Sequence, residues 1–165
     1  MLITHFIAHG IFYAIISTGY LFLFMIIFNP RIWGYQDYPE VIKKKVPPQT
    51  RKERTMAGII SLPWSLFTFG FPLISTYMLK IQLGGEIPFE IAFLNVFILF
   101  IFFFIGDLVI LDWLIISKIT PQFVIIPGTE VEDHKDFSHH YKTHAIATIP
   151  LILLCAVIAT IVTLF

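Results

Sequence analysis

The chain has 165 residues, of which 57% are hydrophobic and only 13% are charged, and its formal net charge is zero. A soluble domain carries about 25% charged residues and less than half apolar residues. A chain of this length could not hide so much apolar surface from water, whereas a bilayer accepts apolar helix surfaces. The composition therefore excludes an ordinary soluble domain and predicts an all-α, polytopic integral membrane protein.

Four segments are long and apolar enough to cross a bilayer, which takes about 20 mostly apolar residues per helix. We predict one domain over residues 1–165, a four-transmembrane-helix bundle with helices at about 2–28, 56–79, 91–117 and 144–165. The first run is longer than the core of a signal peptide, so we expect it to be a spanning helix. The second contains Pro63 and Pro72, which spanning helices tolerate where neighbouring groups satisfy the carbonyls that proline frees.

The basic residues predict the orientation, because Lys and Arg concentrate on the cytoplasmic side of membrane proteins. Ten of the eleven fall in the loops at about 29–55 and 118–143, and only Lys80 lies near the second connection. We therefore expect a multi-pass protein of the cell membrane with these two loops cytoplasmic and both termini outside. Aromatic residues before the basic run at 43–45 are typical of a segment that contacts lipid headgroups. Membrane lipids are the expected partners, and nucleic acid is not.

Two carboxylates interrupt the third apolar segment, where an ionisable group is costly and therefore informative. Asp107 lies near the predicted middle of the bilayer, and Asp112 is closer to the cytoplasmic end. Five residues correspond to a rotation of about 140° on an α-helix, so we expect the two carboxylates to point away from each other. Both are candidates for proton or ion handling. The alternative is that they hydrogen bond to neighbouring helices and fix the packing.

The densest polar stretch precedes the fourth helix and runs from Glu130 to His144. If that helix begins early, Asp136, His140 and His144 follow each other at four-residue spacing and share one face. Two imidazoles one turn apart, with a carboxylate beside them, can bind a divalent metal ion. We predict these three as metal ligands and His139 as a proton-handling group, because imidazole titrates near neutrality. The alternative is a solvated polar stretch at the membrane surface.

A second pair of histidines, His5 and His9, lies one turn apart at the start of the first helix. His9 is a further candidate for proton or ion handling. Because the two histidine groups fall at opposite ends of the predicted bundle, they should not form a single site. This excludes one six-histidine di-iron centre. The sequence also lacks a phosphate-binding glycine-rich loop, a nucleophile elbow and a cysteine pair, since Cys155 is the single cysteine.

Three functions fit these observations. The leading hypothesis is that the protein binds or transports a cation, a proton or a divalent metal ion, through a polar site in the cytoplasmic half of the bundle. Because four helices enclose little space, we expect a pathway to require a homo-oligomer. One alternative is a membrane-embedded enzyme that acts on a lipid-like substrate, with Asp107 or a loop histidine as general acid or base. The other is a structural or assembly protein without chemistry of its own. A divalent metal ion is the single cofactor that the residues suggest.

Overall fold

The computed structural model of the chain describes all 165 residues, and it is 81% helical with no strands. Four stretches of helix are long and apolar enough to cross a membrane, which confirms the four predicted segments. The long elements are α1 (Leu2–Ile27), α4 (Arg51–Gln82), α5 (Phe89–Gly106) with its continuation η1 (Asp107–Ile119), and α6 (Phe137–Leu164). The short elements are α2 (Pro30–Trp33), α3 (Glu40–Lys45), η2 (Gln122–Val124) and η3 (Val131–His134).

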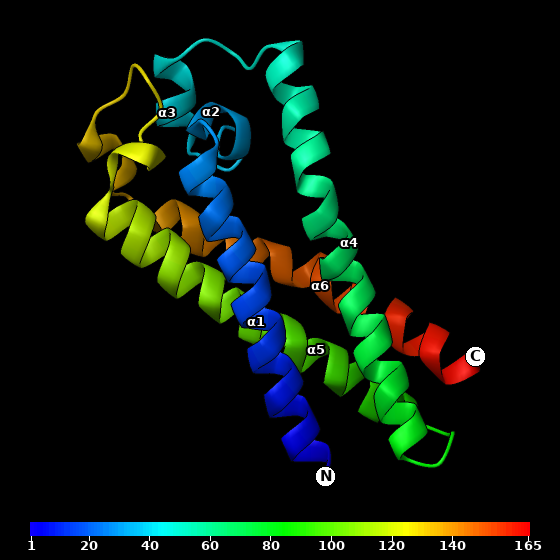
Figure 1. Cartoon of the computed structure of the whole chain (residues 1–165). Coiled ribbons are helices and arrows are strands. Elements are labelled where there is room, and N and C mark those ends of the chain that lie inside the picture. The colour runs from blue at the N-terminus through cyan, green and yellow to red at the C-terminus, as the bar shows by residue number, and fades with distance from the viewer.

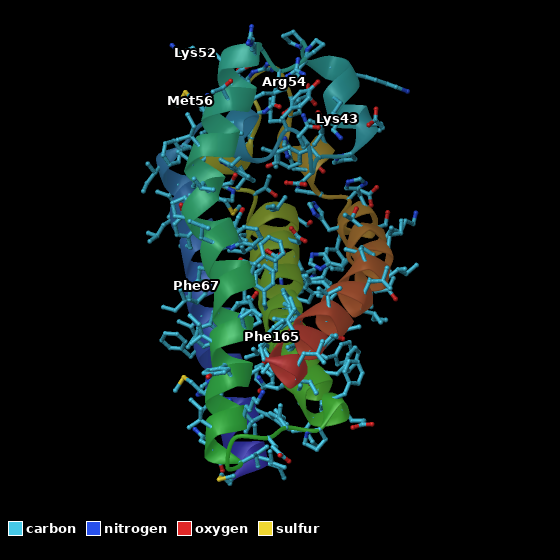
Figure 2. The ribbon with its side chains drawn as sticks, turned by 90° about the vertical axis from the view of Figure 1, so that its right-hand side faces the viewer. Lys43, Lys52, Arg54, Met56, Phe67 and Phe165 are labelled. Atoms are coloured by element: carbon cyan, nitrogen blue, oxygen red, sulfur yellow. The ribbon has the colours of Figure 1, made fainter.

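The two ends of the molecule differ in what covers them (Figure 1). Both termini and the tight turn between α4 and α5 lie in the lower half of the view, and we call this the terminal end. Gly84 and Gly85 form that turn with φ of 97°, a left-handed conformation that favours glycine. Residues 29–50 and 120–136 gather at the opposite end, which we call the loop end. Figure 2 shows Lys43, Lys52 and Arg54 at the loop end.

Two of the long helices begin earlier than the sequence predicted, and in both cases a capping residue explains the boundary. Thr50 starts α4 with a capping box, in which its Oγ1 accepts from the Glu53 backbone N–H at 3.2 Å and Glu53 accepts from the Thr50 N–H at 2.7 Å. Asp136 caps α6 by accepting a hydrogen bond from the Ser138 N–H at 3.0 Å. The early start of α6 places His140 and His144 on the helix.

Two tyrosines of α1 donate hydrogen bonds to the backbone of α4 near its prolines. Pro72 has no N–H, so the carbonyl of Thr68, four residues earlier, loses its helical donor. The Tyr13 hydroxyl donates to that carbonyl at 3.1 Å. The Tyr20 hydroxyl donates at 2.8 Å to the carbonyl of Ile60, close to Pro63. The first bond satisfies a carbonyl that proline frees, and both bonds hold α1 against α4.

Glycines let α1 and α5 approach closely. A Cβ atom added at Gly10 would lie 2.9 Å from the Phe102 ring, and one added at Gly106 would lie 2.8 Å from Thr18 Oγ1. Small residues allow such close backbone contact between membrane-type helices. The contact at Gly106 fixes the position of the residue that follows it, Asp107.

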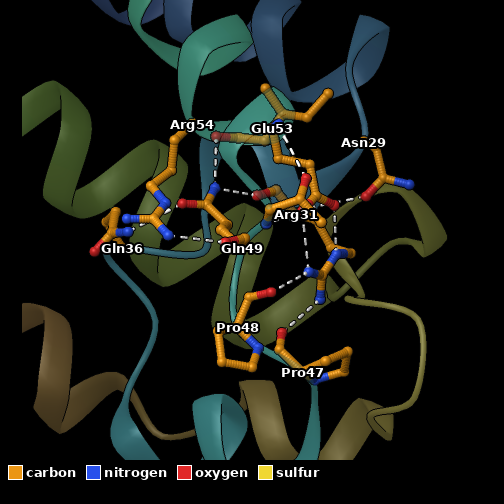
Figure 3. A network of polar contacts seen from close by, with 10 residues as sticks. Asn29, Arg31, Gln36, Pro47, Pro48, Gln49, Glu53 and Arg54 are labelled. Atoms are coloured by element: carbon orange, nitrogen blue, oxygen red, sulfur yellow. Dashed lines mark hydrogen bonds and ion pairs between the residues drawn. The ribbon is translucent and has the colours of Figure 1, made fainter.

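The loop end is an ordered cap. The Arg31 guanidinium donates to the Glu53 carboxylate at 2.7 and 3.2 Å and to the carbonyls of Pro47 and Pro48 at 3.1 and 3.2 Å, as Figure 3 shows. The hydrogen bond to Glu53 raises the pKa of Arg31, which is therefore always charged. The network folds residues 29–50 against the start of α4.

The cap also joins the two loops of that end to each other. The Tyr38 hydroxyl is buried and donates to the Val124 carbonyl at 2.7 Å, and Lys45 forms an ion pair with Asp133 at 2.6 Å. Burial raises the pKa of Tyr38, so its hydroxyl keeps the proton that this bond requires. The first loop is thus held in place over the ends of η1 and α6.

Candidate functional site

The site begins with a change of helix type in the third long helix. From Asp107 to Ile119 the chain forms a π-helix, and its end shows the i to i+5 pattern, with the Thr120 N–H donating to the Ile115 carbonyl at 2.9 Å. A π-helix turns less per residue than an α-helix, so residues five apart lie much closer to the same side of it. Asp107 and Asp112 therefore share a face. The expectation that they point apart is wrong, because it assumed the rotation of an α-helix.

The two carboxylates meet the histidines of α6. His144 Nε2 lies 3.0 Å from Asp112 Oδ2 and 3.5 Å from Asp107 Oδ2, and His140 Nδ1 lies 3.1 Å from Asp112 Oδ1. Asp107, Asp112 and His144 each offer one ligand atom, and these three atoms lie within 4.8 Å of one another. Their side chains are 22%, 13% and 15% exposed, so the group is enclosed but open to a small molecule or ion.

These residues open onto a cavity of about 450 Å³ at the loop end. Most of its wall is apolar and aromatic, and it is contributed by all four long helices and by the first loop. Trp64 lines the wall and its indole N–H has no hydrogen-bond partner, so a donor is available to a bound molecule. The lining residues are Leu21, Phe24, Met25, Trp33, Gly34, Asp37, Tyr38, Ser61, Trp64, Phe103, Phe104, Asp107, Leu111, Asp112, Ile116, His140, Thr143, His144 and Ala147.

A third carboxylate reaches the cavity from the first loop. Asp37 lines it, and His139 Nε2 is hydrogen bonded to the Asp37 backbone carbonyl at 2.9 Å, which ties the loop to the start of α6. The surrounding protein, together with the negative charge of Asp112, raises the pKa of Asp37. Three carboxylates on one small cavity give it a negative potential that favours cations.

The structure brings some of the predicted site residues together and separates others. Asp107 and Asp112, predicted for proton or ion handling, lie together with His140 and His144, which were predicted as metal ligands. Asp136 is exposed and caps α6, outside this group. His139 contacts the first loop, and His9 lies in α1 toward the terminal end, hydrogen bonded to Ser75.

Two features of the site lay outside the sequence prediction. The π-helix, which turns the two carboxylates to one face, has no recognised local pattern. Asp37 stands in an aromatic loop, Trp33 to Tyr38, with no spacing that relates it to the third or fourth helix. Its place in the site depends on how the first loop folds over the loop end.

No protein-family model matches the chain, and neither a curated protein nor a solved structure matches it. Its fold and site define a helical protein with four membrane-length apolar helices and a cavity that holds carboxylates and histidines.

Proposed function

We propose that this chain is a four-span membrane protein that binds or transports a cation, with Asp107, Asp112 and His144 as ligands of a divalent metal ion on the cytoplasmic side. The convergence of these three ligand atoms carries the proposal. The placement on the cytoplasmic side follows from the basic loops, which lie at the same end as the cavity.

The distances within the group support a metal ion. Bonds of about 2.0–2.2 Å from a metal to carboxylate oxygen or imidazole nitrogen place neighbouring ligand atoms about 3.0–3.5 Å apart. The His144 Nε2 to carboxylate distances are 3.0 and 3.5 Å. Two carboxylates and a neutral imidazole carry a charge that a divalent ion neutralises. A set of oxygen and nitrogen donors without thiolate suits Mn²⁺, Fe²⁺ or Zn²⁺.

In this proposal His140 is not a ligand itself but orients the ligand Asp112. Its Nδ1 contacts Asp112 Oδ1, whereas His144 contacts Oδ2 of the same carboxylate. A group that hydrogen bonds to a ligating carboxylate fixes its orientation and tunes its affinity. All of these residues belong to one chain, so binding does not require the homo-oligomer, which stays a prediction for a transport pathway.

Metal binding can be tested on the protein purified in a mild detergent and stripped with EDTA. We expect titration with Mn²⁺, and separately with Zn²⁺, to show one ion per chain. His144→Ala and Asp107→Asn should each weaken binding by about 100-fold or more, because each removes a ligand. His140→Ala should weaken it by about 10-fold, as expected for a residue that orients a ligand.

Asp136→Asn is the matched control. It also replaces a carboxylate by an amide near the start of α6, but it lies outside the group and asparagine can cap the helix in its place. Its affinity should equal that of the wild type. A wild-type protein that binds neither ion across the neutral pH range would contradict the metal site.

A second candidate function is catalysis on a lipid-like substrate. The observation that favours it is the cavity, which is far larger than a metal ion and is lined by Asp107, Asp112 and His140 beneath aromatic walls. Small-molecule sites are typically apolar clefts of about 300–1,000 Å³ with a few convergent polar groups. This hypothesis can be tested by mass spectrometry of the lipid that co-purifies with the wild type and with a Trp64→Ala variant. Equal lipid in both samples would argue against a cavity-bound substrate.

A further inference from the structure

Polar side chains follow the contact between α1 and α4 far beyond the cavity. On α1 four of them, from His5 to Ser17, recur at every fourth residue along one side of the helix, which is unusual in a helix of such apolar composition. Each polar group buried in an apolar setting is costly unless it has a partner or a role. We call this strip the polar seam. Its members on α1 are His5, His9, Tyr13, Ser17 and Thr18, and those on α4 and α5 are Trp64, Thr68, Ser75, Thr76 and Asn95.

Toward the terminal end, the polar seam is a connected network around one hydroxyl. Ser75 Oγ lies 2.8 Å from His9 Nδ1, 3.3 Å from His5 Nε2 and 3.3 Å from Asn95 Nδ2. The two imidazoles are stacked with their centroids 3.8 Å apart, and Asn95 also donates to Thr76 Oγ1 at 3.0 Å. Hydroxyls and imidazoles both accept and donate, so this network can exchange protons.

In the middle of the molecule, the polar seam holds hydroxyls without protein partners. Tyr13 donates to the Thr68 carbonyl. The side-chain hydroxyls of Ser17, Thr18 and Thr68 are buried and have no hydrogen-bond partner. Buried polar atoms without a protein partner are the places where ordered water is held in protein interiors.

The polar seam reaches the cavity at its other end. Thr18 Oγ1 lies against Gly106, directly before Asp107, and the unpaired indole N–H of Trp64 belongs to a residue of the cavity wall. Seven buried side-chain polar atoms of the protein lack a partner. Five of them lie on the polar seam, on Ser17, Thr18, Trp64, Thr68 and Asn95. Such concentration is unexpected if the polar residues serve only to pack helices.

We propose that the polar seam is a proton path that joins the histidine pair at the terminal end to the cavity at the loop end. Water molecules held by the unpaired hydroxyls complete the hydrogen-bonded chain. A proton enters at His5 or His9, passes along the polar seam and leaves through the cavity, and the electrochemical gradient of protons across the membrane drives the transfer. The inference rests on the proposed insertion of the four helices in a membrane, and not on the metal site.

Proton flux into proteoliposomes tests the path, with a pH-sensitive dye inside and a potassium diffusion potential set by valinomycin. We expect flux above that of protein-free vesicles. Tyr13→Phe should lower it by about tenfold, because the variant removes a hydroxyl from the chain of donors and acceptors. The matched control is Tyr20→Phe, which also removes one hydrogen bond from α1 to a carbonyl of α4 but lies off the polar seam. Its flux should equal that of the wild type.

Ser75→Ala provides a second test, with Ser65→Ala as its control on the same helix, since Ser65 bonds only to the Ser61 carbonyl. Flux should fall in the first variant and not in the second. Wild-type vesicles without flux, or equal flux in Tyr13→Phe and Tyr20→Phe, would overturn the proton path. Titration of the same preparations with Mn²⁺ separates the two proposals. Metal binding without flux overturns only the path, and flux without metal binding overturns only the metal site.

Discussion

The protein contains two pairs of histidines, and the two members of each pair lie one turn apart on a single helix. His5 and His9 belong to α1, and His140 and His144 belong to α6. The spacing is the same, but the partners differ. The first pair meets a neutral hydroxyl, whereas the second meets Asp112. A histidine spacing alone therefore does not define a chemistry, because the neighbouring helices supply the charge.

The surroundings of the two histidine pairs also differ in charge and in packing. Ser75 and Asn95, around the first pair, are fully buried and form a close-packed network that carries no formal charge. The second pair opens onto the cavity, which three carboxylates line, those of Asp37, Asp107 and Asp112. A carboxylate favours a cation beside it, either a proton on the imidazole or a metal ion. Only the loop end therefore combines charge with space for a ligand.

The largest expected effect comes from Asp112→Asn. Asp112 contacts both histidines of the second pair, so this variant disrupts the ligand set and its orientation together. We expect Mn²⁺ affinity to fall by about 100-fold or more in calorimetric titration. If this variant bound Mn²⁺ as tightly as the wild type, the Asp112 carboxylate would be dispensable. The second histidine pair would then not differ from the first through its charged partner.

An intermediate effect is expected from Ser75→Ala at the first pair. The variant leaves His9, His5 and Asn95 without a shared partner, and a buried unsatisfied group costs about 1–3 kcal/mol of stability. Thermal unfolding in detergent should show this loss, while Mn²⁺ affinity stays unchanged. An equal fall in Mn²⁺ affinity would show that the two ends do not act independently.

The smallest effect is expected from Asp37→Asn. The pKa of Asp37 is raised above its ordinary value of 3.8, so the folded protein binds this proton more tightly than the unfolded chain. Stability that the protonated carboxyl provides is present at low pH and is lost as the pH rises through the raised pKa. At neutral pH the amide should raise the melting temperature by about 1 °C, a small change because the side chain is partly solvated.

Melting temperatures of the wild type and Asp37→Asn, measured across a pH series, check the sign of this effect. The difference should vanish at pH values below the ordinary pKa, where both side chains are uncharged. A variant that is less stable than the wild type at neutral pH would show that the ionised carboxylate is stabilised by a partner in the cavity.

The four long helices could be predicted from the amino-acid sequence alone. Each is a continuous run of apolar residues, and both the length of such a run and its composition are local properties. The accumulation of basic residues in two loops also follows from the sequence, and the structure gathers both loops at one end. A donor for the carbonyl that Pro72 frees was expected in kind, since freed carbonyls need donors. That this donor is Tyr13 depends on the contact between α1 and α4.

Which polar groups meet could not be predicted, because it depends on how the helices fold against one another. Asp107 and Asp112 share a face because the third helix changes to a π-helix, and local sequence gives no rule for that change. Asp136 had the same spacing from His140 as His144 has, yet it caps the helix at the surface. The ligand set combines side chains from distant segments, η1 and α6. Such long-range contacts depend on how the helices pack, which the residue pattern of any single helix does not contain.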